Sequence, residues 1–174
     1  MARKAKRPIV KTTLLIVGEG ADDEAFINHM KELFFRRQKG NKGPKIESGD
    51  GGSAGNIITN ALRTFKADEY DCKLFVLDSD LPPNAEDSKK AREGGFDIIL
   101  WSPQSLEGAL LDVLGERVNE HETSQDLKKR LHPRLNGPHT QSRSYAALFP
   151  KVVLESTTNS SVVDVRNAIS DSNP

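Results

Sequence analysis

The chain of 174 residues lacks several features that would settle its class at once. Cys72 is its single cysteine, so neither an intrachain disulfide nor a cysteine-ligated metal cluster can form within it. No apolar run approaches the roughly 20 residues that span a bilayer, and the basic start is not followed by the apolar segment of a secretory signal. We therefore expect a cytoplasmic protein with no membrane partner.

The chain also carries no excess of charge of either sign. Lys plus Arg and Asp plus Glu both number 25, so the formal net charge is zero and no global basic field attracts a polyanion. Any nucleic-acid site must then be local. Residues 1–10 form a basic arm, which is either a frayed, solvated end or a segment that contacts phosphates. A second basic segment holds the better candidates for nucleic-acid backbone contacts, which are Arg36, Arg37, Lys39 and Lys42.

What the chain does contain is a series of short apolar runs separated by amphipathic segments. Residues 12–17, 72–77 and 96–101 read as strands buried on both faces, and residues 45–47 as a weaker strand. Helical patterns over 25–34, 85–93 and 110–114, and one capped by Ser53, alternate with these strands. The alternation predicts one α/β domain over residues 11–170, a parallel sheet flanked by helices. Segments 124–131, 145–149 and 162–169 predict a helical C-terminal extension.

Acidic residues follow three of the predicted strands. Glu19 follows the first, Asp78 and Asp80 the second, and Glu107 comes shortly after the third. Any one of them can serve as a helix cap or turn former. In a parallel sheet, however, the carboxyl ends of strands meet at one edge, where ligands bind. Carboxylates gathered there repel one another unless a cation pairs with them, and oxygen ligands without cysteine suit Mg²⁺ or Mn²⁺. Asp23, one helical turn beyond Glu19, is placed to join them.

Three further features have alternative interpretations. The glycine-rich residues 49–55 form either a phosphate-binding loop or a connector, and they lack the Gly-Lys-Ser/Thr ending of a Walker A loop. Trp101 either stacks on a base or packs at the edge of the core. His121, His132 and His139 are spaced 11 and 7 residues apart, which is typical of surface histidines and does not predict a zinc site.

Three short motifs together resemble a Toprim domain: Ile16-Val17-Gly18-Glu19-Gly20, Leu77-Asp78-Ser79-Asp80 and Ser105-Leu106-Glu107. More narrowly, the chain resembles RloB-like proteins and the Toprim portion of OLD-family nucleases. The resemblance implies a metal site built from Glu19 with Asp23, Asp78 with Asp80, and Ser105 with Glu107. It also implies a downstream lysine, for which Lys151 is the first candidate and Lys128 and Lys129 are the others. The chain departs from OLD proteins in having no ATPase domain, and Asp23 stands where glutamate is more usual.

The resemblance implies a Mg²⁺- or Mn²⁺-dependent nuclease or nicking enzyme that acts on DNA or RNA. Glu19, Asp78, Asp80 and Glu107 would serve the metals, and Lys151 would offset charge in the transition state. The association of RloB-like genes with anti-phage loci further implies a defence effector that acts with a partner protein. Two alternatives remain. One is a Toprim-like module that binds nucleic acid or a partner without cutting. The other is a haloacid-dehalogenase-type phosphatase with Asp78 as nucleophile, although that motif normally follows the first strand.

Overall fold

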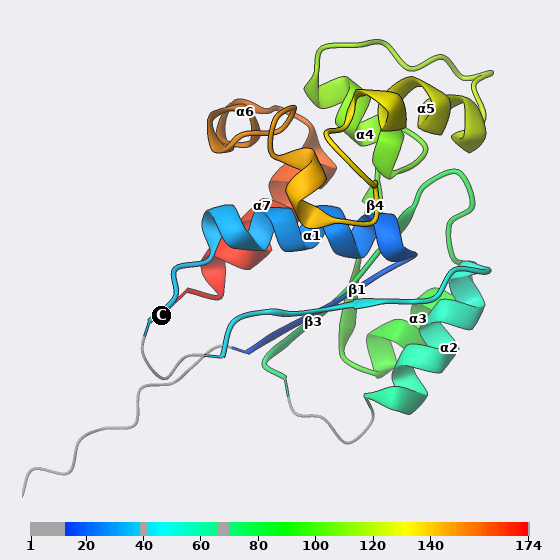
Figure 1. The fold of residues 1–174 in the computed structure, drawn as a ribbon. Coiled ribbons are helices and arrows are strands. Elements are labelled where there is room, and N and C mark those ends of the chain that lie inside the picture. The colour runs from blue at the N-terminus through cyan, green and yellow to red at the C-terminus, as the bar shows by residue number, and fades with distance from the viewer. Residues whose placement is uncertain (1–12, 39–41, 66–69, 174) are drawn as a thin grey trace, which may run out of the picture.

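A computed structural model describes residues 13–38, 42–65 and 70–173. Its centre is an all-parallel sheet in the order β2-β1-β3-β4 (Figure 1). The strands are β1 (Leu14–Gly18), β2 (Lys45–Ser48), β3 (Cys72–Asp78) and β4 (Phe96–Trp101). The predicted α/β class, with its parallel sheet and flanking helices, is confirmed. The basic arm of residues 1–10 and Lys39 lie outside the described residues.

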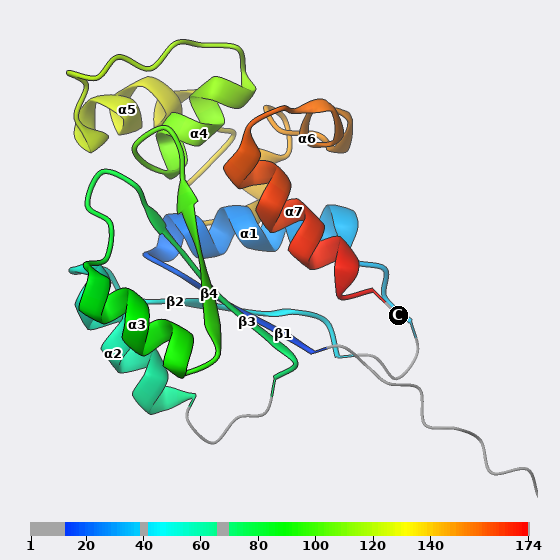
Figure 2. The ribbon, with the colours of Figure 1, turned by 180° about the vertical axis from the view of Figure 1, so that it is seen from behind.

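Helices cover both faces of the sheet (Figures 1 and 2). On the first face lie α1 (Ala21–Phe34) and α7 (Ser160–Asp171), and on the second lie α2 (Ala54–Thr64) and α3 (Ala85–Glu93). Alternate residues of β1 serve the two faces: Leu14 and Ile16 pack on the first, Leu15 and Val17 on the second. Because both faces are buried, the strand reads as an unbroken apolar run instead of an alternating one.

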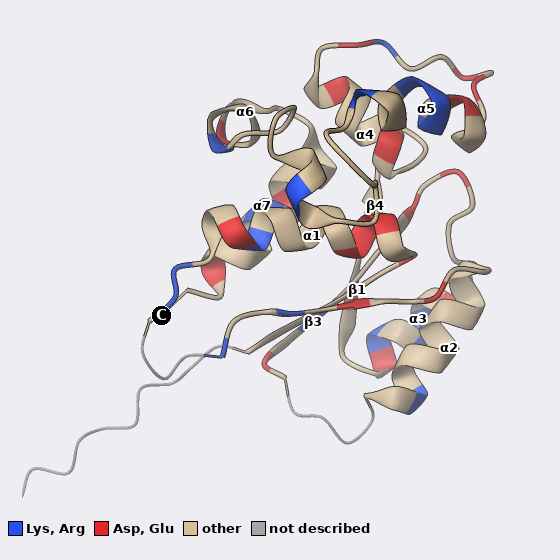
Figure 3. Ribbon diagram, in the orientation of Figure 1, with Lys and Arg blue, Asp and Glu red and all other residues tan. Residues whose placement is uncertain are grey.

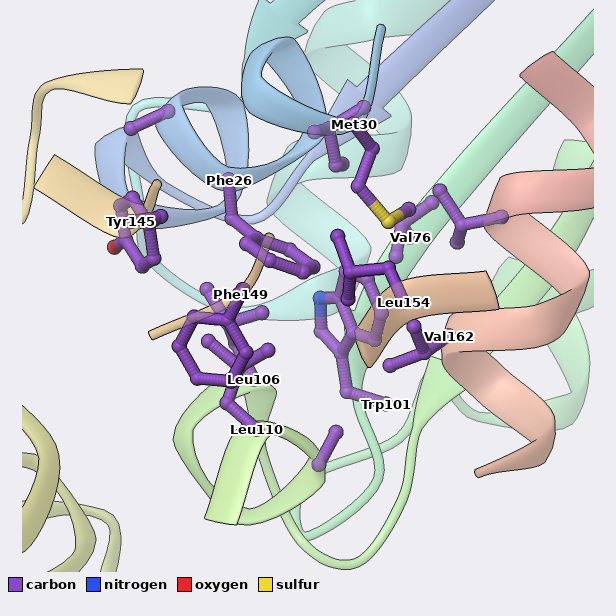
Figure 4. Close-up of a cluster of buried hydrophobic side chains, with 14 of the residues drawn as sticks. Phe26, Met30, Val76, Trp101, Leu106, Leu110, Tyr145, Phe149, Leu154 and Val162 are labelled. Carbon is purple, nitrogen blue, oxygen red and sulfur yellow. The ribbon is translucent and has the colours of Figure 1, made fainter. Parts of the chain in front are cut away.

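An aromatic cluster fills the core of the first face (Figure 4). The ring of Phe26 lies 6.1, 5.5 and 5.9 Å, between centroids, from the rings of Trp101, Tyr145 and Phe149. All four side chains are almost completely buried. Trp101 therefore packs within the core and offers no exposed ring face to a base. The cluster ties α1 to the end of β4 and to the segment around residues 145–149.

The remaining helices lie beyond the carboxyl end of the sheet and along α1 (Figure 1). They are α4 (Leu106–Val113), α5 (Ser124–Leu131) and α6 (Lys151–Ser156), with two 3-10 turns, η1 (His132–Arg134) and η2 (Ser142–Tyr145). The helices predicted over 124–131 and 162–169 are confirmed. The helix predicted over 145–149 is wrong: η2 ends at Tyr145, and α6 begins only after Pro150. Pro150 has no N–H to donate and its fixed φ suits the entry to a helix, so it starts α6 instead of ending the earlier segment.

The strand order fixes where a ligand would bind. The chain leaves β1 toward β2 on one side and leaves β3 toward β4 on the other. Such a reversal opens a crevice at the carboxyl ends of the two central strands. Glu19 and Asp78 lie at those two strand ends. Across the described part of the chain, no helix has both the length and the apolar character needed to cross a membrane.

Candidate metal centre

A cleft of about 230 Å³ lies at the carboxyl ends of β1 and β3. It is lined by five carboxyl residues, one lysine and four other residues: Glu19, Asp22, Asp23, Asp78, Glu107, Lys128, Gly20, Ala21, Gly51 and Leu106. Figure 3 shows the acidic colour on the first turn of α1 and on α4, facing the basic helix α5. Four of the residues predicted from sequence, Glu19, Asp23, Asp78 and Glu107, therefore line one cleft.

Glu19 and Asp78 connect the two strand ends through backbone groups. The Asp78 backbone N–H donates to Glu19 Oε2 at 3.0 Å, and the Leu106 N–H donates to Asp78 Oδ1 at 3.1 Å. The Gly51 N–H donates to the Glu19 carbonyl at 2.9 Å, which brings the glycine-rich loop to the rim. Gly51 has φ +75, a left-handed conformation that glycine adopts without strain. These bonds fix the two carboxylates before any ligand arrives.

Asp23 is buried at the start of α1. Its Oδ2 accepts the Gly20 N–H at 3.0 Å, and its Oδ1 accepts the Trp101 indole N–H at 2.6 Å. The residue at position 18 must be glycine for this packing, because a Cβ there would lie 2.6 Å from the Asp23 Cβ. The tryptophan that ends β4 is thus the partner of a carboxylate in the cleft, a contact that no sequence pattern indicates.

Ser105 and Glu107 form the third predicted pair, and both are buried. Ser105 caps α4, since its Oγ accepts the Gly108 N–H at 3.4 Å. The same hydroxyl lies 3.2 Å from Glu107 Oε2 and donates to it. The other oxygen, Oε1, lies 3.0 Å from His132 Nε2. Ser105 therefore orients Glu107, and Glu107 connects the cleft to α5 and η1.

Burial and mutual repulsion raise the pKa of two of these carboxyls. Burial raises the pKa of Asp78 to about 9, with further upward contributions from Asp23, Glu19, Glu107 and Asp80. Burial also raises the pKa of Asp23 to about 7, and Glu107 and Glu19 add to it, while its two hydrogen bonds act in the opposite direction. Carboxyls raised in this way carry uncompensated negative charge when ionised, which a cation would neutralise.

The donor set fits a hard divalent cation. Carboxylate oxygens are the ligands that Mg²⁺ and Mn²⁺ prefer. Among the described residues lining the cleft, Lys128 alone carries a positive charge, and it stands against five carboxyls. The N-termini of α1 and α4 also point toward the cleft, which favours negatively charged groups there, including a phosphate.

Asp80 is directed away from the other carboxylates. It is exposed, its Oδ2 accepts the Ser124 hydroxyl at 2.8 Å, and its backbone N–H donates to the Gln104 carbonyl at 2.9 Å. Its side chain lines a separate hollow with Glu122 and Ser124. In this structure Asp80 holds α5 and the loop before α4 beside the end of β3.

Lys151 lies at the start of α6 and does not line the cleft. Its Nζ is 3.7 Å from Glu155 and 5.8 Å from the centre of the Phe34 ring, and it shares a hollow with Arg36. That hollow is at the far end of α1, and a helix of 14 residues is about 21 Å long. The lysine that lines the cleft is Lys128, whose Nζ is 4.0 Å from Asp22 Oδ2.

The exposed basic residues Arg36, Arg37 and Lys42 follow the C-terminal end of α1, and Lys39, predicted with them, lies outside the described residues. Because α1 runs away from the cleft, Arg36 is separated from the carboxylates by the length of that helix. The structure therefore does not bring these basic residues to the cleft. It places Arg36 beside Lys151 instead.

The structure also brings together two histidines that their spacing separates. His132 Nε2 lies 3.9 Å from Asp22 Oδ2, and His139 Nδ1 hydrogen-bonds Asp22 Oδ1. The two imidazole rings stack, with centroids 4.2 Å apart and planes 11° from parallel. The two rings meet because the loop after η1 folds back on itself, where the Asn136 N–H donates to the Ser144 carbonyl, and not because of a helical or strand repeat. His121 remains exposed and is not part of this group.

The chemistry of the cleft must be inferred from its own side chains, because comparison with models of known families, with curated proteins and with solved structures gave no match. These side chains can bind a divalent cation through Glu19, Asp23 and Asp78. Glu107 can hold a second ligand position, and Lys128 can approach an anionic group beside them. A phosphate ester can be bound and cleaved by a metal ion, helix N-termini and a lysine that meet at the carboxyl ends of parallel strands.

Proposed function

We propose that this chain is a Mg²⁺- or Mn²⁺-dependent nuclease with a Toprim-like site. The observation that carries the proposal is the convergence of five carboxyl residues on one cleft at the switch point of the sheet. Two of them, Asp78 and Asp23, have pKa values raised to about 9 and about 7, as expected where a cation is to be bound. Stability alone gives no reason to gather these charges.

Each side chain has a role in this proposal. Glu19, Asp23 and Asp78 hold a divalent cation, and Glu107, oriented by Ser105, holds a second. When bound, such cations would neutralise the charge that develops on the oxygens of a phosphodiester. Lys128, which also lines the cleft, offsets charge on the same phosphate.

The basic residues at the far end of α1 favour a polymer as the substrate over a small phosphate ester. Arg36 and Lys151 line one hollow, with Arg37 and Lys42 exposed nearby along the chain. The length of α1, about 21 Å, corresponds to about six nucleotide steps of 3.4 Å. A nucleic acid of that span would contact the basic residues and the cleft together, whereas a mononucleotide would not.

The phosphatase alternative has less support. Its motif would need Asp78 and Asp80 to act on the same phosphate. Here Asp80 accepts a hydrogen bond from Ser124, and Asp78 ends the third strand along the chain. Glu19 and Asp23, which lie against Asp78, have no role in that reaction. The remaining alternative, a module that binds nucleic acid without cutting it, is an outcome of the experiment below.

The test uses the full chain with plasmid DNA, single-stranded DNA and tRNA, in Mg²⁺ or Mn²⁺ and in excess chelator. We expect metal-dependent cleavage that Asp78→Asn lowers by about 1,000-fold, because several kcal/mol of metal stabilisation correspond to that factor. Asp97→Asn, which changes an exposed carboxyl of β4 outside the cleft, should leave cleavage unchanged. Absence of cleavage of all three substrates, with metal-dependent binding retained, would establish the non-catalytic module.

Two lysine variants identify the lysine that acts. Lys128 lines the cleft and Lys151 does not, so Lys128→Ala should lower the cleavage rate by about 100-fold or more. Lys151→Ala should weaken nucleic-acid binding with little change in the rate at saturating substrate. The reverse pattern would assign the catalytic role to Lys151 and would require α6 to move toward the cleft.

A further inference from the structure

Beside the carboxylate cleft lies a second group of ligand atoms with a different character. Asp22, His132 and His139 each offer one atom, and these atoms all lie within 4.8 Å of one another. Two of the three are imidazole nitrogens, whereas the cleft itself offers oxygen. All three residues are partly exposed, so a cation from solvent can reach them.

We propose that Asp22, His132 and His139 form a binding site for a borderline transition-metal cation, with Zn²⁺ as the best fit. Imidazole ligands favour Zn²⁺ over Mg²⁺, and two histidines with one carboxylate, plus an open fourth position, make a common zinc site. Ligand atoms about 2.1 Å from Zn²⁺ at tetrahedral angles lie roughly 3.5 Å apart. The ligand atoms are already within reach of one ion, and binding requires the two stacked imidazoles to rotate until both nitrogens point at it.

The three ligands are held by separate elements that are already fixed. Asp22 is in the first turn of α1, and His132 follows α5 directly. The loop that carries His139 is held by the Tyr145 hydroxyl, which donates to the His139 carbonyl at 2.7 Å. The Asn136 N–H donates to the Ser144 carbonyl at 3.1 Å and closes the same loop. The stacked rings therefore face Asp22 without help from a metal.

Glu107 joins this group to the cleft, because its Oε1 lies 3.0 Å from His132 Nε2 while its side chain also lines the cleft. Lys128, with Nζ 4.0 Å from Asp22 Oδ2, is a neighbouring positive charge that a bound cation would displace. Its side chain is partly exposed. Asp22 also lines the cleft, but the two imidazole ligands do not, and the cation is of a different class, so the proposal does not depend on nuclease activity.

The test is a calorimetric titration of the metal-free full chain with Zn²⁺. We expect saturable binding that His132→Ala and His139→Ala each weaken by about 100-fold or more, since removing a ligand costs at least as much as removing its support. His121→Ala, which removes an exposed histidine outside the group, should bind Zn²⁺ like the wild type. Equal Zn²⁺ affinity in the wild type and in both histidine variants would overturn the proposal. The contacts of Asp22 with the two histidines would then serve only to hold the loop against α1.

A variant of the neighbouring cleft separates this proposal from the proposed function. Asp78→Asn should lower Mn²⁺ binding and cleavage but leave the Zn²⁺ affinity within about threefold of the wild type. If neither the wild type nor any variant cleaves nucleic acid while the wild type still binds Zn²⁺, only the proposed nuclease function is refuted. Loss of Zn²⁺ binding in the histidine variants with Mn²⁺-dependent cleavage retained would support both sites.

A measurement on the unmodified chain removes the risk that a variant fails to fold. One equivalent of Zn²⁺ should shift the imidazole NMR resonances of His132 and His139 and leave those of His29 and His121 in place. His29 is buried against the Phe149 carbonyl at 2.8 Å and reports on general structural change. Equal shifts at His121 would indicate nonspecific binding and would contradict the proposal.

Discussion

The two faces of the sheet are built in different ways. On the second face, the buried residues of α2 and α3 are all apolar: Ala54, Ile57, Ile58, Ala61 and Ala91. The first face and its helices hold all eight of the buried polar or charged residues in the described part of the chain: Asp23, His29, Ser105, Glu107, Ser144, Asn159, Ser161 and Ser172. Burying a polar group costs free energy unless it is hydrogen-bonded. The second face is therefore an apolar scaffold, and the buried polar groups, several of them helix caps, gather on the first face, which carries the cleft.

Part of the polar burial on the first face supports the site indirectly. Asn159 caps α7 and its Nδ2 donates to the Ser102 carbonyl at 2.7 Å and to Asp112 at 2.8 Å. The Ser161 hydroxyl lies 3.2 Å from the Ser102 N–H and accepts from it. These bonds fix the loop between β4 and α4, which leads directly to Ser105. The C-terminal helix thus positions the third acidic motif although it contributes no ligand.

The largest expected effect comes from a variant that alters only the second face. Ile58→Ala, at a fully buried position of α2, should lower the free energy of unfolding by about 2–5 kcal/mol through lost burial and a residual cavity. Because α2 contributes no carboxylate to the cleft, the Mn²⁺ affinity of the folded protein should not change. Urea unfolding and Mn²⁺ titration of the same variant measure both. A change in affinity beyond about threefold would show that the two faces are coupled.

The next effect concerns pH and belongs to the first face. The pKa of Asp78 is about 9 in the folded chain and about 4 when unfolded, so the folded state holds the extra proton between these values. Metal-free protein should accordingly lose stability as pH rises from about 5 to 9, by about 1 kcal/mol per pH unit. Asp23, with its pKa raised to about 7, adds to the slope below that pH.

Urea unfolding in chelator at several pH values measures this slope. Asp78→Asn removes the titrating group and should flatten it. If Mg²⁺ binds the ionised carboxylates as proposed, it should stabilise the wild type more at pH 8 than at pH 6. A wild-type stability that rises with pH in chelator would contradict the proposed electrostatics of the cleft.

The sequence predicted the scaffold and the carboxyl residues that line the cleft better than the contacts between them. Unbroken apolar runs mark strands buried on both faces, and carboxyl ends of parallel strands converge, so Glu19 and Asp78 could be placed together. The other contacts of the cleft join residues that are far apart in the sequence, so they could not be predicted from it. Trp101 lies 78 residues from Asp23, and the His132–His139 pair depends on an irregular loop that no periodicity describes. Likewise, an acidic residue after a strand does not reveal which way its side chain turns, as Asp80 shows.

Trp101→Phe tests whether the aromatic core of the first face tunes the proposed metal site. The change keeps most of the buried ring but removes the N–H that donates to Asp23 at 2.6 Å. Loss of such a supporting bond should weaken Mn²⁺ binding by about 10- to 100-fold. Phe96→Leu is the matched control, since Phe96 belongs to the same strand but packs on the second face. Similar weakening in both variants would indicate a general loosening of β4 instead of a specific contact.

The smallest effects come from two lysines, one on each face, that both pair with carboxylates. Lys90 on α3 lies 2.9 Å from Glu86 at the surface, so Lys90→Ala should lower stability only slightly and leave Mn²⁺ affinity unchanged. Lys128→Ala removes a positive charge that lines the cleft, and Mn²⁺ affinity should rise about fivefold, which corresponds to about 1 kcal/mol. Calorimetric titration at low salt resolves this difference. Tighter Mn²⁺ binding together with slower cleavage would identify Lys128 as a residue that acts on the substrate, whereas weaker Mn²⁺ binding would show that it orders the carboxylates.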